Sequence, residues 1–166
     1  MKNIGNMRGA ERGSRLTAYT GVLGALLLLL TGGCAAAADC PPTKPDMLGP
    51  FYVPDAPVRA SVGQGYILRG LAKSTKGCSP IVGAKIEFWL TGPEGDYDDD
   101  HRATVYSDNK GAYRFESNPP QQYFGRPPHI HIRISAPGFK TLITQHYPEI
   151  GKSEAFFDMV LIPASR

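Results

Sequence analysis

The chain has 166 residues and a formal charge of +3, from 18 basic and 15 acidic residues. Residues 1–38 hold four of the basic residues and one of the acidic ones, which leaves 14 of each in the rest of the chain. The surplus charge therefore belongs to the N-terminal segment, and nothing in the composition indicates nucleic-acid binding. The 128 residues after Ala38 are enough for one domain with a hydrophobic core and too few for two.

Residues 1–38 have the pattern of a secretory leader. Basic residues come first, an apolar stretch covers residues 22–30, and small residues follow over 31–38. The apolar stretch is too short to span a bilayer, and cleavage after Ala38 would start the mature chain at Asp39. The alternative is lipidation of Cys34, which follows a leucine run, although the leucine stands four residues before it rather than three. We expect an exported protein, either periplasmic, secreted or lipid-anchored at the cell envelope, with no membrane contact other than a lipid on Cys34.

Cleavage after Ala38 would leave two cysteines, Cys40 and Cys78. An even number in an oxidising compartment predicts a disulfide. Closing a loop of this length stabilises a fold by about 4 kcal/mol in the chain-entropy model. Thiolate metal ligands are the alternative, but these cysteines lack Cys-x-x-Cys spacing.

The mature chain, residues 39–166, is expected to be one all-β domain. Residues 41–57 are rich in proline, so they cannot form a helix and are expected to wrap the domain as an extended N-terminal arm. Short strand-like runs separated by Gly and Pro turns then follow, at 66–72, 81–90, 103–107, 112–116, 129–135, 142–146 and 156–162. No sustained helical period follows residue 39. The pattern predicts an antiparallel β-sandwich of about seven to eight short strands.

The run Arg-Pro-Pro-His-Ile-His at 126–131 places two histidines two residues apart in an alternating segment. In a strand, His129 and His131 share one face about 6.6 Å apart, while the isoleucines at 130, 132 and 134 face the core. Two imidazoles on one face can converge on a metal ion. The alternative is a pair of histidines that only satisfy hydrogen bonds on a half-buried strand.

Two tyrosines in turns extend this pattern. Tyr97 follows Gly95-Asp96, and Tyr123 follows the Pro119-Pro120 turn six residues before His129. Each alone would more often be a surface tyrosine. Together with the histidines they form a set of two phenolates and two imidazoles, which suits Fe(3+), because a phenol with a pKa of about 10 needs a strongly Lewis-acidic ion to be held deprotonated.

These residues and several other segments resemble the intradiol ring-cleavage dioxygenases, which open catechols between the two hydroxyls. The resemblance covers nearly all of the mature chain. It rests on Gly49-Pro50-Phe51-Tyr52, Leu68-Arg69-Gly70, the run 78–84, Ile86-Glu87-Phe88-Trp89, Gly95-Asp96-Tyr97, Gly111-Ala112-Tyr113, the run 126–131 and Thr144-Gln145. The interval from Tyr123 to His129 is shorter than in the well-known cytoplasmic members.

The resemblance implies an Fe(3+) dioxygenase that uses O2 to convert a small aromatic diol, a catechol or hydroxyquinol, into a muconate-type diacid. It implies that Arg126 and Gln145 line the cleavage pocket. By the same resemblance the iron ligands are Tyr97, Tyr123, His129 and His131, and Tyr123 is the tyrosine that substrate displaces.

Two other functions stay open at this point. One is a non-catalytic secreted β-sandwich module that binds phenolic ligands. The other is a zinc or copper hydrolase using both histidines, which leaves the tyrosines unexplained. His101 and His146 are spare histidines, and His146 is expected on the face opposite to Gln145. Trp89 is expected to cover the edge of the sandwich.

Overall fold

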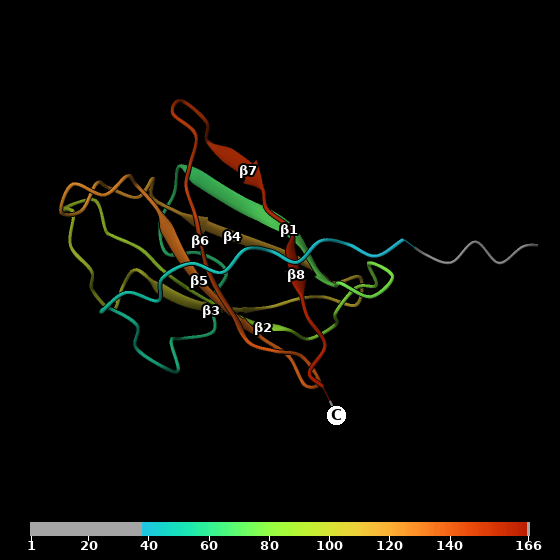
Figure 1. The fold of residues 1–166 in the computed structure, drawn as a ribbon. Coiled ribbons are helices and arrows are strands. Elements are labelled where there is room, and N and C mark those ends of the chain that lie inside the picture. Colours follow the sequence, from blue (N-terminus) through green and yellow to red (C-terminus); the bar gives the residue numbers. More distant parts are fainter. Residues whose placement is uncertain (1–37, 166) are drawn as a thin grey trace, which may run out of the picture. The chain divides into compact units, whose positions relative to one another are not determined.

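The computed structural model describes residues 38–165 as eight short strands in two sheets (Figure 1). The strands are β1 (Tyr66–Ser74), β2 (Lys85–Trp89), β3 (Arg102–Tyr106), β4 (Ala112–Ser117), β5 (Ile130–Ser135), β6 (Leu142–His146), β7 (Glu154–Phe156) and β8 (Met159–Leu161). One sheet has the order β4-β1-β7, with β8 also paired to β1, and the other has the order β3-β2-β5-β6. The predicted all-β sandwich is confirmed. The leader and Cys34 lie outside the described residues, which contain no helix long and apolar enough to cross a membrane.

The core lies between the two sheets and follows the predicted alternation. Ile130, Ile132 and Ile134 of β5 are fully buried, and Phe88 of β2 stacks on Phe115 of β4 with ring centroids 4.3 Å apart. Burying each such side chain contributes about 1.5–3 kcal/mol. The residues between them point to the other face of the β3-β2-β5-β6 sheet, and this outer face carries the histidines.

Two of the predicted strand runs differ from the observed strands. The run 81–90 begins as a strand only at Lys85, because its first residues form a turn in which Ala84 donates its N–H to Ser107 Oγ. The run 156–162 contains only the last residue of β7 and the whole of β8, and the strands are interrupted at Asp158, whose carboxylate accepts the N–H of Leu71 in β1 at 2.8 Å. The alternation of residue types along the sequence does not reveal that a side chain accepts a hydrogen bond from a backbone N–H of a strand.

The N-terminal arm crosses the outer face of the β3-β2-β5-β6 sheet in extended form, as predicted (Figure 1). Thr43 donates its N–H to Val160 of β8, and Asp46 donates its N–H to Ile143 of β6. Farther along, Val58 forms a parallel bridge with Thr104 of β3. The arm therefore buries polar residues of the outer face that would otherwise meet solvent.

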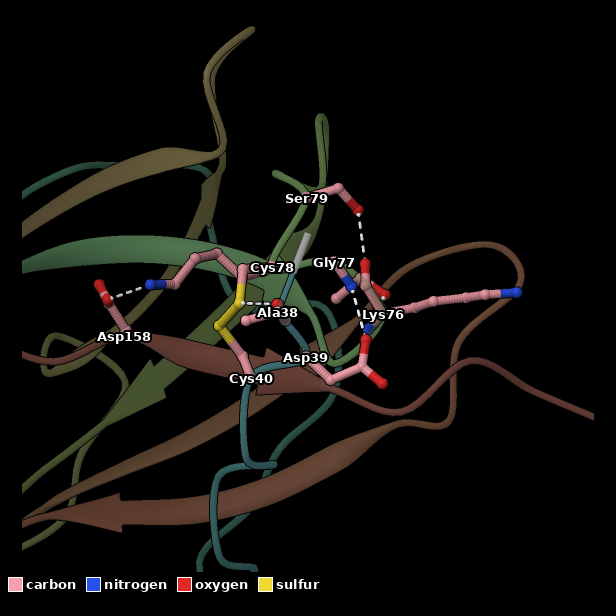
Figure 2. Close-up of a disulfide and its surroundings, with 10 residues drawn as sticks. Ala38, Asp39, Cys40, Lys76, Gly77, Cys78, Ser79 and Asp158 are labelled. Carbon is pink, nitrogen blue, oxygen red and sulfur yellow. Dashed lines mark hydrogen bonds and ion pairs between the residues drawn. A yellow bond between two sulfur atoms is a disulfide. The ribbon is translucent and has the colours of Figure 1, made fainter. Parts of the chain in front are cut away.

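The predicted disulfide is confirmed and fixes the start of the arm. Cys40 and Cys78 are bonded, with their Cα atoms 5.2 Å apart. Figure 2 shows the carboxylate of Asp39 beside it, where Oδ1 accepts the N–H of Gly77 at 2.9 Å. The link ties the arm to the connection between β1 and β2.

Candidate metal centre

Three donor atoms converge at the outer face of the sheet. The Nε2 atoms of His129 and His131 are 3.0 Å apart, and Tyr97 Oη lies 3.2 Å from each of them. His131 is in β5 and His129 immediately precedes it, whereas Tyr97 comes from the loop between β2 and β3. The tyrosine and the two histidines, which are more than 30 residues apart in the sequence, thus form one triangle of side-chain donors.

No choice of protonation for the two imidazoles satisfies every nitrogen of this triangle with a hydrogen bond. His129 Nδ1 donates to the Pro127 carbonyl at 2.7 Å, so its Nε2 carries a lone pair. His131 Nδ1 is buried and makes no well-formed hydrogen bond among the described residues, although the backbone of Met47 approaches the ring and opposes the lowering of its pKa. If His131 carries its proton there, two Nε2 lone pairs face each other at 3.0 Å; if it carries the proton on Nε2, the buried Nδ1 lone pair is unsatisfied. A cation between the two Nε2 atoms removes the first conflict.

Burial also sets the charge of each donor. It lowers the pKa of His131 to about 3, with further lowering by His129 and Arg126, and it lowers the pKa of His129. Both imidazoles are therefore neutral near pH 7 and offer lone pairs. Burial raises the pKa of the Tyr97 hydroxyl to about 12, although the charge of Arg126 opposes this. Ionising Tyr97 at neutral pH therefore requires a strong cation beside it.

The triangle has the dimensions of adjacent ligand positions around one ion. Metal bonds of about 2.1 Å at right angles place neighbouring donors about 3 Å apart. Within residues 38–165, no three His, Cys, Asp or Glu side chains are arranged as metal ligands. Tyr97 is therefore the third side-chain donor that this site offers beside the two histidines, and a phenolate is a hard anionic donor.

The ring of His131 is held between a stacked tryptophan and a close backbone segment. Trp89, its cross-strand partner, stacks on the imidazole at 4.9 Å with an interplanar angle of 7°. From the arm, Gly49 has a φ of +72°, and a Cβ there would lie 3.0 Å from His131 Cε1. The expectation that Trp89 only covers the sandwich edge missed this contact, because the register that pairs it with His131 is not encoded in its own strand.

Tyr123 lies on the wall of the same cleft but outside the triangle. Its ring centroid is 5.3 Å from that of Tyr97, and its hydroxyl makes no hydrogen bond to the three donors. The structure thus brings together three of the four predicted ligands, Tyr97, His129 and His131. It does not place Tyr123 with them.

The cleft above the triangle has a volume of about 480 Å³. Its walls are mostly apolar and aromatic, and Phe51 stacks on Tyr97 with centroids 4.3 Å apart. Among the described residues that line it, Arg126 is the sole charged side chain. The lining residues are Met47, Gly49, Pro50, Phe51, Tyr97, Tyr123, Phe124, Arg126, His129 and His131.

The prediction that Gln145 lines the pocket is not what the structure shows. Gln145 is buried on β6, opposite His131 in the register, and is absent from the lining of the cleft. Its Oε1 accepts Arg126 Nη2 at 2.8 Å, and its Nε2 donates to the Met47 carbonyl at 2.6 Å. It lies behind Arg126, because the arm occupies the space in front of it.

Neither spare histidine reaches the site. His101 pairs with Asp98 at 2.7 Å within the loop that carries Tyr97. His146 lies on the face opposite to Gln145, as predicted, and its Nε2 is 2.7 Å from the Tyr66 hydroxyl. Burial lowers the pKa of His146 to about 4, which keeps it neutral.

A strained turn at residues 123–126 forms part of the wall of the cleft. Tyr123 and Arg126 close it through a 2.9 Å backbone hydrogen bond, and both central residues have positive φ, +46° at Phe124 and +75° at Gly125. Such turns favour Asn-Gly, and a bulky side chain in the left-handed region is disfavoured by about 1–2 kcal/mol. Phe124 is nonetheless 90% exposed, and its ring contacts that of Tyr123 with centroids 4.8 Å apart, so packing offsets little of this strain.

Replacing Phe124 with Asn is therefore expected to raise the free energy of unfolding by about 1 kcal/mol, because Asn tolerates the left-handed region. Urea unfolding followed by circular dichroism measures the change. Phe124→Ala is the control, since it removes the same ring but keeps a residue that disfavours positive φ. Equal stability of the Asn and Ala variants would contradict the assignment of strain to this turn.

The chain is similar to known dioxygenases in sequence and in fold. The chain is 34% identical to the catechol 1,2-dioxygenase of Candida albicans over 142 residues, 63% of this chain and 46% of that protein. It is 28% identical to the chlorocatechol 1,2-dioxygenase of Pseudomonas sp. strain P51 over 66% of this chain and 57% of that one. The dioxygenase domain of a carbohydrate-binding fusion protein from Streptomyces sp. SirexAA-E superposes with a TM-score of 0.67, at 28% identity, over 75% of this chain and all of that domain.

These relatives are intradiol ring-cleavage dioxygenases, so the resemblance predicted from the sequence is confirmed. The chain spans about half the length of the curated relatives it matches. No protein-family model matches it.

Proposed function

We propose that the protein is an iron(III)-dependent dioxygenase that opens catechol-type rings between the two hydroxyls and yields muconate-type diacids. The triangle of Tyr97 Oη, His129 Nε2 and His131 Nε2 carries this proposal, because it offers one phenolate and two neutral imidazoles at the spacing of adjacent ligands. The curated relatives, named for catechol and chlorocatechol 1,2-dioxygenation, support the substrate class.

The three donors of the triangle would hold the ion. When bound, a ferric ion supplies Lewis acidity that draws electron density from a catecholate and opens its ring to O2. It also lowers the pKa of the Tyr97 phenol far enough to make it an anionic ligand at neutral pH. The phenolate would offset part of the +3 charge and favour the oxidised state, and the two neutral imidazoles would donate their lone pairs.

The remaining residues of the cleft bind and orient the substrate. The flat, mostly apolar walls, which include Phe51 and Pro50, suit a planar aromatic ring and exclude water from it. Arg126 lines the cleft, so its positive charge would stabilise the negative charge that develops on the ring oxygens during cleavage. Tyr123 lies on the wall, with its Oη free of the triangle to exchange a proton with a substrate hydroxyl.

The test is reconstitution with ferric iron followed by oxygen-uptake measurements on catechol, chlorocatechol and hydroxyquinol. We expect a red protein, from phenolate-to-iron charge transfer, and one O2 consumed per ring opened to the diacid. A preparation that stays colourless and inert after ferric loading would overturn the proposal. Binding of catechol without O2 uptake would instead support the non-catalytic phenol-binding module. The zinc or copper hydrolase alternative gives no role to Tyr97 in the triangle.

We also propose that the protein is exported. The Cys40–Cys78 disulfide supports this, because disulfides persist in oxidising compartments. Fractionation of cells making the wild type and Cys34→Ala distinguishes the routes: lipidation predicts that only the wild type is found with membranes, and cleavage after Ala38 predicts identical soluble distributions. Retention of both in the cytoplasm would contradict export.

A further inference from the structure

Tyr147 connects Arg126 to the N-terminal arm behind the cleft. Its hydroxyl accepts Arg126 Nη2 at 2.9 Å and donates to Asp46 Oδ2 at 3.0 Å. It also lies 2.8 Å from Gln145 Oε1, but a phenol has one proton and the carboxylate is the stronger acceptor. Tyr147 follows Gln145 by two residues and comes directly after β6.

The hydrogen bonds to Tyr147 and Gln145 use one nitrogen of the guanidinium, Nη2. The two protons of Arg126 Nη2 go to Gln145 Oε1 at 2.8 Å and to Tyr147 Oη at 2.9 Å. In the described part of the chain, the other three protons, on Nε and Nη1, have no hydrogen-bond partner. A planar guanidinium fixed at two points on one nitrogen cannot rotate, so its remaining donors keep one direction.

Asp46 is itself held in place. Its Oδ1 accepts the N–H of Met47 at 2.6 Å, and its own N–H donates to the Ile143 carbonyl at 2.9 Å. Gln145 binds the carbonyl of Met47 from the other side. The same short segment of the arm continues directly into Gly49, which approaches His131 in the cleft wall.

We propose that Tyr147 and Asp46 are positioning residues for Arg126: Asp46 orients the Tyr147 hydroxyl, and that hydroxyl, with Gln145, fixes the guanidinium toward the cleft. The expected change in kcat rests on the proposed function, whereas the fixed position of the guanidinium does not depend on it. Neither residue is among those that line the cleft, so both act through Arg126.

The decisive variant is Tyr147→Phe, which removes the hydroxyl and keeps the ring that packs 5.9 Å from His129. With the iron-loaded protein and catechol, we expect kcat to fall about tenfold while KM stays within about twofold. A misdirected guanidinium reduces stabilisation of the transition state more than it reduces binding of the substrate in its ground state. Iron content and the melting temperature should match the wild type. Tyr106→Phe is the matched control, because Tyr106 is half-exposed on β3 and away from the cleft, and it should leave kcat unchanged.

A double-mutant cycle and a structure complete the test. Asp46→Ala should lower kcat in the same direction, and adding it to Tyr147→Phe should cause no further loss, because Asp46 acts through Tyr147. If the losses in kcat of the two variants add, Asp46 does not act through Tyr147. Crystal structures of the wild type and Tyr147→Phe report independently of activity: we expect Arg126 Nη2 to leave Gln145 in the variant. A guanidinium that stays in place would overturn the positioning role even in an active enzyme, whereas failure of the wild type to consume O2 would overturn the proposed function alone.

Discussion

Replacing Tyr97 with Phe is expected to lower the affinity for ferric iron by more than about 100-fold and to abolish both colour and O2 uptake. Substitution of groups that merely orient metal ligands costs 10–100-fold in affinity, and Tyr97 is the sole phenol in the triangle. The ring remains to stack on Phe51, so the fold should persist. Iron retained after dialysis against a chelator, measured together with the visible spectrum, gives the result.

Tyr123→Phe is the matched comparison, because both changes remove one phenol from the same cleft. The Tyr123 hydroxyl makes no hydrogen bond to the three donors of the triangle, so this variant should keep its iron and lose turnover. A normal melting temperature in both variants would separate metal loss from unfolding. Iron loss in Tyr123→Phe with retention in Tyr97→Phe would show that the triangle is not the metal centre.

Local periodicity predicted the parts of the fold that depend on neighbours in sequence. Ile130 and His131 point to opposite faces because strand side chains alternate, so one short run sets both the core and the two imidazoles. The arm was predictable from its prolines, which exclude a helix. Counting cysteines indicated the disulfide, because cleavage after Ala38 would leave only Cys40 and Cys78 to pair.

The support of the site was not predictable in this way, because it depends on register and on contacts between distant segments. Trp89 stacks on His131 only because β2 pairs with β5 at that residue. Gln145 lies behind Arg126 because the arm carries Met47 across β6. Tyr97 could be placed near the histidines by family resemblance, but no local pattern in its loop indicates a ligand.

Removing the disulfide, with Cys40 and Cys78 both replaced by Ser, is expected to lower the free energy of unfolding by about 3–4 kcal/mol. The bond closes a loop with a sequence separation of 38, so its loss restores chain entropy to the unfolded state. Denaturant unfolding of the oxidised wild type and the double variant measures the difference. The reduced wild type is the control for the substitutions themselves and should match the variant.

The same variant should keep its metal site under conditions where it is folded. Several hydrogen bonds hold the arm between the disulfide and the cleft wall. Thr43 exchanges hydrogen bonds with Val160, Thr144 Oγ1 donates to the Lys44 carbonyl, and Asp46 donates its N–H to Ile143. Fraying from Cys40 should therefore stop at Thr43 and leave Gly49 against His131. We expect iron affinity and kcat within about twofold of the wild type, because the triangle is not strained by the change. Loss of iron in proportion to the loss of stability would instead mean that the disulfide, and not these hydrogen bonds, holds the arm against the site.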